Sequence, residues 1–78
     1  MTNTLNEHEE LAKADQAIAE SIKRVSRQIT HLGWLAKRGQ DTTRERALLE
    51  TMTQALKVRR AYRQLILQVV AQDEPLVQ

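Results

Sequence analysis

The residues that could carry acid–base or metal chemistry are few and widely separated. The two histidines, His8 and His31, are 23 positions apart, and the chain has no cysteine. His8 precedes Glu9, but no second histidine follows at the spacing of a zinc-protease helix. The carboxylates of Glu7, Glu9 and Glu10 are typical of the solvated start of a helix. There is also no glycine-rich phosphate loop and no nucleophile beside a base. We therefore expect no catalytic, cofactor-binding or metal-binding residue, and a protein that is not an enzyme.

Positive charge is concentrated in the middle of the chain. The net charge is +2 overall, but residues 21–63 carry +8 while residues 1–20 carry −4 and residues 64–78 carry −2. A basic stripe of this kind could contact phosphates of a nucleic acid. The basic side chains concerned are Lys23, Arg24, Arg27, Lys37, Arg38, Arg44, Arg46, Lys57, Arg59, Arg60 and Arg63.

Four of these basic residues lie close to the expected turn and are the candidate anion-binding residues: Lys37, Arg38, Arg44 and Arg46. The acidic ends of the chain would repel a long duplex, and no helix-turn-helix spacing is visible. Solvated helix faces or acidic protein surfaces are therefore the other interpretation of the same cluster.

The composition favours a small all-α domain that needs support from another chain. Its 78 residues form one domain with a modest core and no disulfide, and two glycines and one proline leave few β-turn signals. The first ten residues lack the pattern of a secretory signal. The longest uncharged run of the helical body, Gln64 to Gln72, is far shorter than the ~20 residues of a membrane span. We expect a cytoplasmic protein without a membrane span.

Two long helices are expected, joined by a short turn at about residues 39–42. Thr4 and Glu7 have the spacing of a capping box, so the first helix should run from about residue 5 to residue 38. Gly39 suits the left-handed residue that ends a helix. Thr42 and Glu45 form a second capping box, and the second helix should run over about residues 43–72, followed by a short polar tail over 73–78. Because the connection is so short, the helices must form an antiparallel, coiled-coil-like hairpin.

The apolar residues of the first helix fit a heptad repeat. One predicted position is occupied by Leu11, Ile18, Val25 and Leu32, and the other by Asp15, Ile22, Ile29 and Ala36. Gly33 inside this helix indicates either a close approach of the second helix or a bend.

A helical hairpin of this register should bring acidic residues of the first helix level with arginines of the second. Asp15 and Glu20 lie at the level of three arginines: Arg59, Arg60 and Arg63. An ion pair between the two helices would fix their register.

The second helix is apolar on more sides than one neighbouring helix can cover, most of all near its end. We therefore expect a protein partner to contact it. The candidate partner-binding residues are Tyr62, Leu65, Ile66, Leu67, Val69 and Val70, together with Trp34 on the first helix. Trp34 is either an interface anchor or a side chain folded over its own helix.

The segments LLETMTQAL (residues 48–56) and YRQLI (residues 62–66) resemble those of a known family. They are similar to the E-type co-chaperones of the type III secretion needle, of the YscE and SsaE kind. The resemblance implies a short cytoplasmic helical hairpin in a hetero-oligomer, bound to a helical-repeat co-chaperone of the G type. Together the two would keep the needle subunit monomeric before export. The alternative from the residues alone is self-association into a four-helix bundle that binds nucleic acid through its basic middle.

Overall fold

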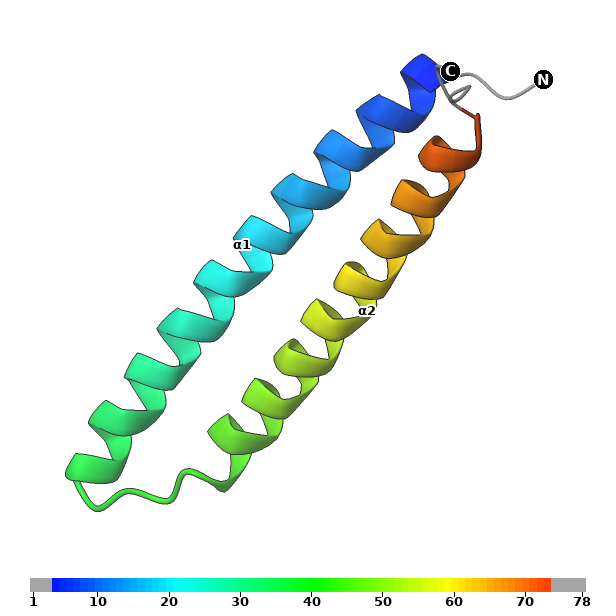
Figure 1. The fold of residues 1–78 in the computed structure, drawn as a ribbon. Helices are drawn as coiled ribbons and strands as arrows, with labels where there is room; N and C mark the ends of the chain where they lie inside the picture. Colours follow the sequence, from blue (N-terminus) through cyan, green and yellow to red (C-terminus); the bar gives the residue numbers. More distant parts are fainter. Residues whose placement is uncertain (1–3, 74–78) are drawn as a thin grey trace.

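The chain folds into two long antiparallel α-helices joined by a short turn (Figure 1). The computed structural model describes residues 4–73, and side chains within this range over residues 6–72. Helix α1 spans Thr4–Lys37 and helix α2 spans Thr43–Asp73. The expected all-α hairpin is confirmed, and the observed helix ends lie within one residue of the expected ones. The predicted tail beyond Asp73 and the Thr4 side chain of the first capping box lie outside the described residues.

Gly39 ends α1 as its sequence predicts. Its φ of 71° is in the left-handed region, which a residue without a Cβ adopts freely. The Gln40 N–H donates to the carbonyl oxygen of Leu35 at 3.2 Å, and the Gly39 N–H donates to that of Ala36 at 3.0 Å. This pair of hydrogen bonds is a Schellman motif, which satisfies two of the last free carbonyls of the helix.

The start of α2 is capped differently from the expected Thr42–Glu45 box. The Asp41 carboxylate accepts hydrogen bonds from the backbone N–H and the hydroxyl of Thr43, at 3.0 and 2.7 Å. The Thr42 hydroxyl instead accepts a hydrogen bond from Nε of Arg46 at 3.0 Å. Asp41 therefore supplies a cap, because its carboxylate accepts the hydrogen bond of the first free backbone N–H of the helix, that of Thr43.

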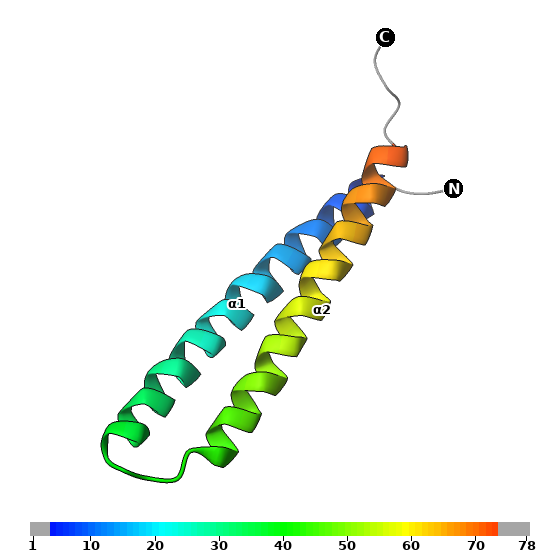
Figure 2. The same ribbon diagram turned by 60° about the horizontal axis from the view of Figure 1, so that its bottom comes forward.

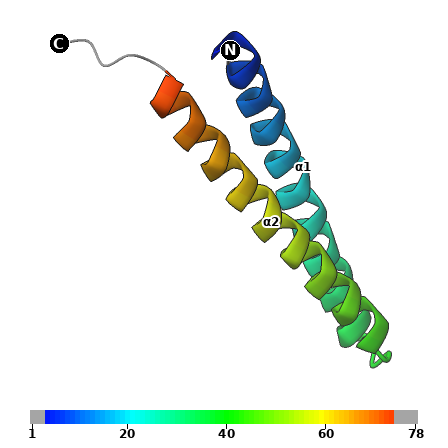
Figure 3. The ribbon, with the colours of Figure 1, turned by 90° about the vertical axis from the view of Figure 1, so that its right-hand side faces the viewer.

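The two helices lie side by side along their whole length and cross at a small angle (Figures 2 and 3). Their facing residues form a heptad repeat, which we call the hairpin seam. On α1 the seam consists of Leu11, Ala14, Ile18, Ser21, Val25, Gln28, Leu32 and Leu35, all buried or half-buried. On α2 it consists of Glu45, Leu49, Met52, Leu56, Arg59, Arg63, Ile66 and Val70, all likewise buried or half-buried.

Half of the heptad predicted for α1 is therefore wrong. Leu11, Ile18, Val25 and Leu32 do face α2, but the second seam position lies one residue earlier than predicted. The residues assigned to that position are exposed instead: Asp15, Ile22, Ile29 and Ala36. The physical reason is the carboxylate of Asp15, which would lose its hydration in the seam. With the observed register Ala14 takes the buried place.

The observed register lets polar groups of the two helices pair within and beside the seam. Asp15 is half exposed and forms an ion pair with Arg63, which confirms that an acidic residue of α1 meets an arginine of α2. Gln28 is buried, and its amide donates to the Glu45 carbonyl oxygen at 3.0 Å. These contacts fix the level of one helix against the other.

The apolar core of the hairpin is small. Ala14, Ile66 and Val70 form a buried cluster with Leu11 packed against it, and Leu56 is buried farther along the seam. Gly33 takes no part in a close approach of the helices, contrary to one of our expectations, because a Cβ built there meets no atom within 4 Å. Because only a few apolar side chains are buried between the two helices, the hairpin leaves much of its apolar surface uncovered.

Candidate functional site

The outer side of α2 carries a long strip without any charge. We call it the uncharged face. It is composed of Ala47, Leu48, Thr51, Gln54, Ala55, Val58, Ala61, Tyr62, Leu65, Gln68, Val69 and Gln72. In a chain with 28% charged residues, about three of these twelve positions would be charged by chance. The strip is continuous because its members recur at steps of three and four, the spacing of one helix side.

Large apolar side chains project from this face. The exposed fraction is 67% for Val58, 59% for Leu65, 50% for Tyr62 and 49% for Leu48. They belong to a second heptad series that runs beside the hairpin seam: Leu48, Thr51, Ala55, Val58, Tyr62, Leu65, Val69 and Gln72. Since alternating steps of three and four are the pattern with which one helix packs against another, the face has the form of an unpaired coiled-coil surface.

The structure separates the predicted partner-binding residues of α2 into three groups, the third of which is Leu67 alone. Tyr62, Leu65 and Val69 are exposed on the uncharged face. Ile66 and Val70 are 8% and 7% exposed and belong to the core that packs against α1. These two side chains are therefore occupied within the hairpin, because the seam passes through them.

Leu67 is half-buried and lies on the other side of α2, seven positions beyond Arg60. Arg60 lines a groove with Asp15 and Arg63, whereas Tyr62 lines the opposite groove with Ala17 and Arg59. Leu67 therefore does not share the uncharged face. Sequence reasoning missed Leu48 and Val58, which the lack of charge along the strip could have revealed.

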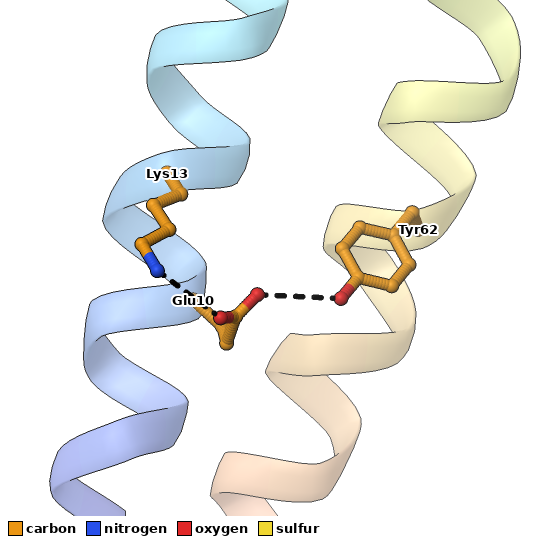
Figure 4. A network of polar contacts seen from close by, with 3 residues as sticks. All are labelled: Glu10, Lys13 and Tyr62. Atoms are coloured by element: carbon orange, nitrogen blue, oxygen red, sulfur yellow. Dashed lines mark hydrogen bonds and ion pairs between the residues drawn. The ribbon is translucent and has the colours of Figure 1, made fainter.

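Tyr62 lies at the edge of the uncharged face that borders α1. Figure 4 shows its ring reaching across from α2 toward Glu10, whose carboxylate also contacts Lys13. The Tyr62 hydroxyl donates to Oε2 of Glu10 at 3.5 Å, and Nζ of Lys13 lies 3.6 Å from Oε1. The hydroxyl is thus directed to the polar border, which leaves the apolar ring beside Val58 and Leu65.

Trp34 is held against its own helix. Its ring stacks on His31 with centroids 6.5 Å apart and an interplanar angle of 16°. The Arg38 guanidinium carbon lies 4.1 Å from the centroid of the Trp34 ring, a cation–π contact. Half of the indole remains exposed, at 52%. Lys13 lines the same groove as Tyr62, and Trp34 follows Lys13 by three heptads on α1. The indole therefore lies on the side of the hairpin that carries the uncharged face, and its place in the same interface stays a prediction.

The basic cluster near the turn is partly engaged in local contacts. Arg38 covers Trp34, and Arg46 donates to the Thr42 hydroxyl. Lys37 and Arg44 are exposed. Two hydrogen bonds from Thr43 hold the pKa of Asp41 below its ordinary value, with a smaller contribution from the charge of Arg46. The cluster can attract an anionic surface, although the carboxylate of Asp41 interacts with Arg46 and opposes an anion at that point.

Residues 4–73 contain no group of three or more histidine and acidic side chains placed to hold a metal ion. Within the same range neither helix has the length and apolarity needed to cross a membrane.

The comparisons with known proteins do not assign the chain to a family. No protein-family model matches it, and no curated protein and no solved structure is similar to it. The uncharged face is consequently the feature from which a function has to be argued.

Proposed function

We propose that this chain is a non-enzymatic helical adaptor or co-chaperone that binds an amphipathic helix of a partner protein along the uncharged face of α2. One observation carries the proposal. Among the described residues four apolar side chains are buried, whereas eight large apolar side chains are exposed. Five of those eight lie in the second heptad series of α2: Leu48, Val58, Tyr62, Leu65 and Val69.

The driving force for binding is burial of these side chains. Complete burial of one Val, Leu or Ile side chain contributes about 1.5–3 kcal/mol. A partner helix that inserts its own apolar residues between Val58, Tyr62 and Leu65 would recover part of that free energy. Much of the gain is offset by the loss of translational and rotational freedom on association. The five exposed side chains have the i, i+3, i+4 and i+7 spacing of the anchors with which helices bind one another.

The resemblance of α2 to the E-type co-chaperones names one specific form of this proposal. The partner would then be a helical-repeat co-chaperone, and the cargo a needle subunit of type III secretion. In either form the hairpin acts by covering an apolar helix that would otherwise aggregate.

The experiment compares two variants that introduce the same charge at neighbouring positions of α2. Leu65→Asp places a carboxylate in the uncharged face, while Gln64→Asp places it one residue away, beside Arg60 and Arg63 in the opposite groove. Tagged chains are used to retain proteins from cells that make this protein. We expect a partner that is retained by the wild type and by Gln64→Asp but lost from Leu65→Asp. Equal retention by both variants would contradict the proposal.

A second candidate function is self-association into a four-helix bundle with nucleic acid bound at the basic cluster. It is favoured by the lack of charge on the uncharged face, because no like charges oppose the pairing of two copies. Light scattering distinguishes it, since the wild type would have twice the 9.0 kDa mass of the chain and Leu65→Asp would not. Binding of nucleic acid through Lys37 and Arg44 would weaken steeply as salt rises, whereas an apolar interface responds little.

A further inference from the structure

A second unpaired heptad face lies on α1, on the other side of the hairpin. We call it the isoleucine face. It comprises Ala19, Ile22, Ser26, Ile29, Gly33 and Ala36, all of them exposed except the half-buried Gly33. The exposed fraction is 42% for Ile22 and 54% for Ile29. The steps between its members alternate between three and four, as in the hairpin seam itself.

The position of this face follows from the grooves that border the two helices. Asp15, which precedes Ile22 and Ile29 by steps of seven, lines a groove with Arg60 and Gln64. The uncharged face borders the opposite groove through Tyr62. The isoleucine face and the uncharged face therefore lie on opposite sides of the hairpin, and one helix cannot cover both.

Gly33 supplies independent evidence that the face is shaped for another helix. A glycine inside a helix destabilises it by about 1 kcal/mol relative to alanine. Nothing in the hairpin requires this glycine, since a Cβ at this position would meet no atom within 4 Å. The space that a side chain would fill here, between Ile29 and Ala36, is open. We call this space the recess; without a Cβ, a side chain or the backbone of a second helix could approach closely there.

The charges along both edges of the isoleucine face indicate the chemistry of its occupant. Lys23 and Lys37 follow the outer edge on α1. Arg46, Lys57 and Arg60 follow the edge on α2 beside the groove, where Glu50 is the acidic residue among them. These residues together carry a net charge of +4. Glutamates at the flanking positions of a partner helix would meet a cation on either side, as they do in coiled coils.

We propose that the isoleucine face binds an amphipathic helix with acidic flanks, which makes the hairpin a two-sided adaptor. The apolar residues of that helix pack on Ile22 and Ile29, and one of its side chains enters the recess at Gly33. Its carboxylates contact the basic residues on both edges. A phosphate backbone could use the same cations, but it would leave the two isoleucines uncovered, so we favour a protein helix over a nucleic acid.

The test uses two synthetic peptides of four heptads with the same apolar seam, one with glutamate and one with lysine at the flanking positions. Each peptide is monomeric at neutral pH because its flanks repel one another. Binding to the full chain is measured by titration calorimetry at low salt. We expect the acidic peptide to bind about tenfold or more tightly than the basic one. The reason is that several exposed contacts with the cations of the hairpin are attractive for glutamate and repulsive for lysine. Equal affinities would overturn the proposal.

Three variants locate the binding site. Ile29→Asp and Gly33→Leu should each weaken binding of the acidic peptide at least tenfold, although Gly33→Leu should make α1 more helical by circular dichroism. Leu65→Asp should remove only binding of either peptide to the uncharged face and leave the preference for the acidic peptide unchanged, so failure of the α2 proposal is distinguishable from failure of this one. Unchanged binding by Gly33→Leu would overturn the assignment of the recess.

Two other results would also contradict the proposed occupant. The first is self-association of the chain that Ile29→Asp abolishes, which would make a second copy the occupant. The second is a short RNA or DNA duplex that competes for the site with an affinity above that of the acidic peptide.

Discussion

The pair of substitutions Ile66→Ala and Ile29→Ala tests the register of the hairpin directly, because the chemical change is the same and the burial differs. Ile66 is 8% exposed in the core cluster with Ala14 and Val70, whereas Ile29 is 54% exposed on the isoleucine face. The heptad predicted from the sequence placed Ile29 in the seam. The structure places it outside.

The expected magnitudes follow from this burial. Replacing a buried isoleucine by alanine costs about 2–5 kcal/mol, and the lower end applies here because the core is thin and can relax. Part of the cost is offset by the better helix propensity of alanine, by a few tenths of a kcal/mol. We expect Ile66→Ala to lose about 2 kcal/mol and Ile29→Ala to stay within about 0.5 kcal/mol of the wild type.

The assay is urea unfolding followed by circular dichroism at two protein concentrations tenfold apart. A domain of this size supplies about 3–5 kcal/mol from its core, so Ile66→Ala should remove about half of the stability. With a slope of about 1 kcal/mol per molar urea, the midpoint should fall by about 2 M. An equal loss for Ile29→Ala would refute the observed register. If that loss were larger at the higher protein concentration and shrank on dilution, Ile29 would be buried between copies instead.

Three further outcomes are expected from the same assay. Gly39→Ala should destabilise the hairpin by about 1 kcal/mol, because the backbone of Gly39 is left-handed. Gly33→Ala should instead stabilise it by about 0.5–1 kcal/mol, because alanine favours the helix and its Cβ meets no other atom. Stability changes of the same sign for the two variants would contradict the assigned geometry. Asp41→Ala should lower the unfolding midpoint at neutral pH. Since the folded pKa of Asp41 is depressed, this difference should be present above about pH 4 and shrink as the pH falls through the lowered pKa; a difference that did not shrink with falling pH would refute it. Asp15→Ala should cost about 0.2–1 kcal/mol through loss of its pair with Arg63, and less at 1 M salt; a loss independent of salt would argue against the ion pair.

The helices and their turn could be predicted from the sequence because local chemistry determines them. Gly39 could only be the end of a helix, and a link of a few residues between two long helices forces an antiparallel hairpin. The cap of α2 was harder, since Asp41, Thr42 and Thr43 are all good capping residues and only the backbone geometry decides among them.

The seam could be predicted only in part, because α1 carries two heptad series on neighbouring sides of the helix, and either could face α2. Periodicity favoured Ile22 and Ile29 for their hydrophobicity, while the fold buries Ser21 and Gln28 and exposes the isoleucines. No pattern in one helix shows which of two adjacent stripes faces the neighbour. The same ambiguity led to Ile66 and Val70 being assigned to a partner surface, although the surplus of apolar residues on α2 was inferred correctly.

The central claim is that the uncharged face of α2 contacts a partner helix, and site-specific photo-crosslinking tests it most directly. Benzoylphenylalanine is placed at position 65, in the face, and at position 64, one residue outside it, in cells that make this protein. We predict a discrete crosslinked product from position 65 whose partner peptide is helical and amphipathic, and no crosslink to that same partner from position 64, which lines the other groove. Crosslinks of equal yield from both positions, or from position 64 alone, would contradict the claim.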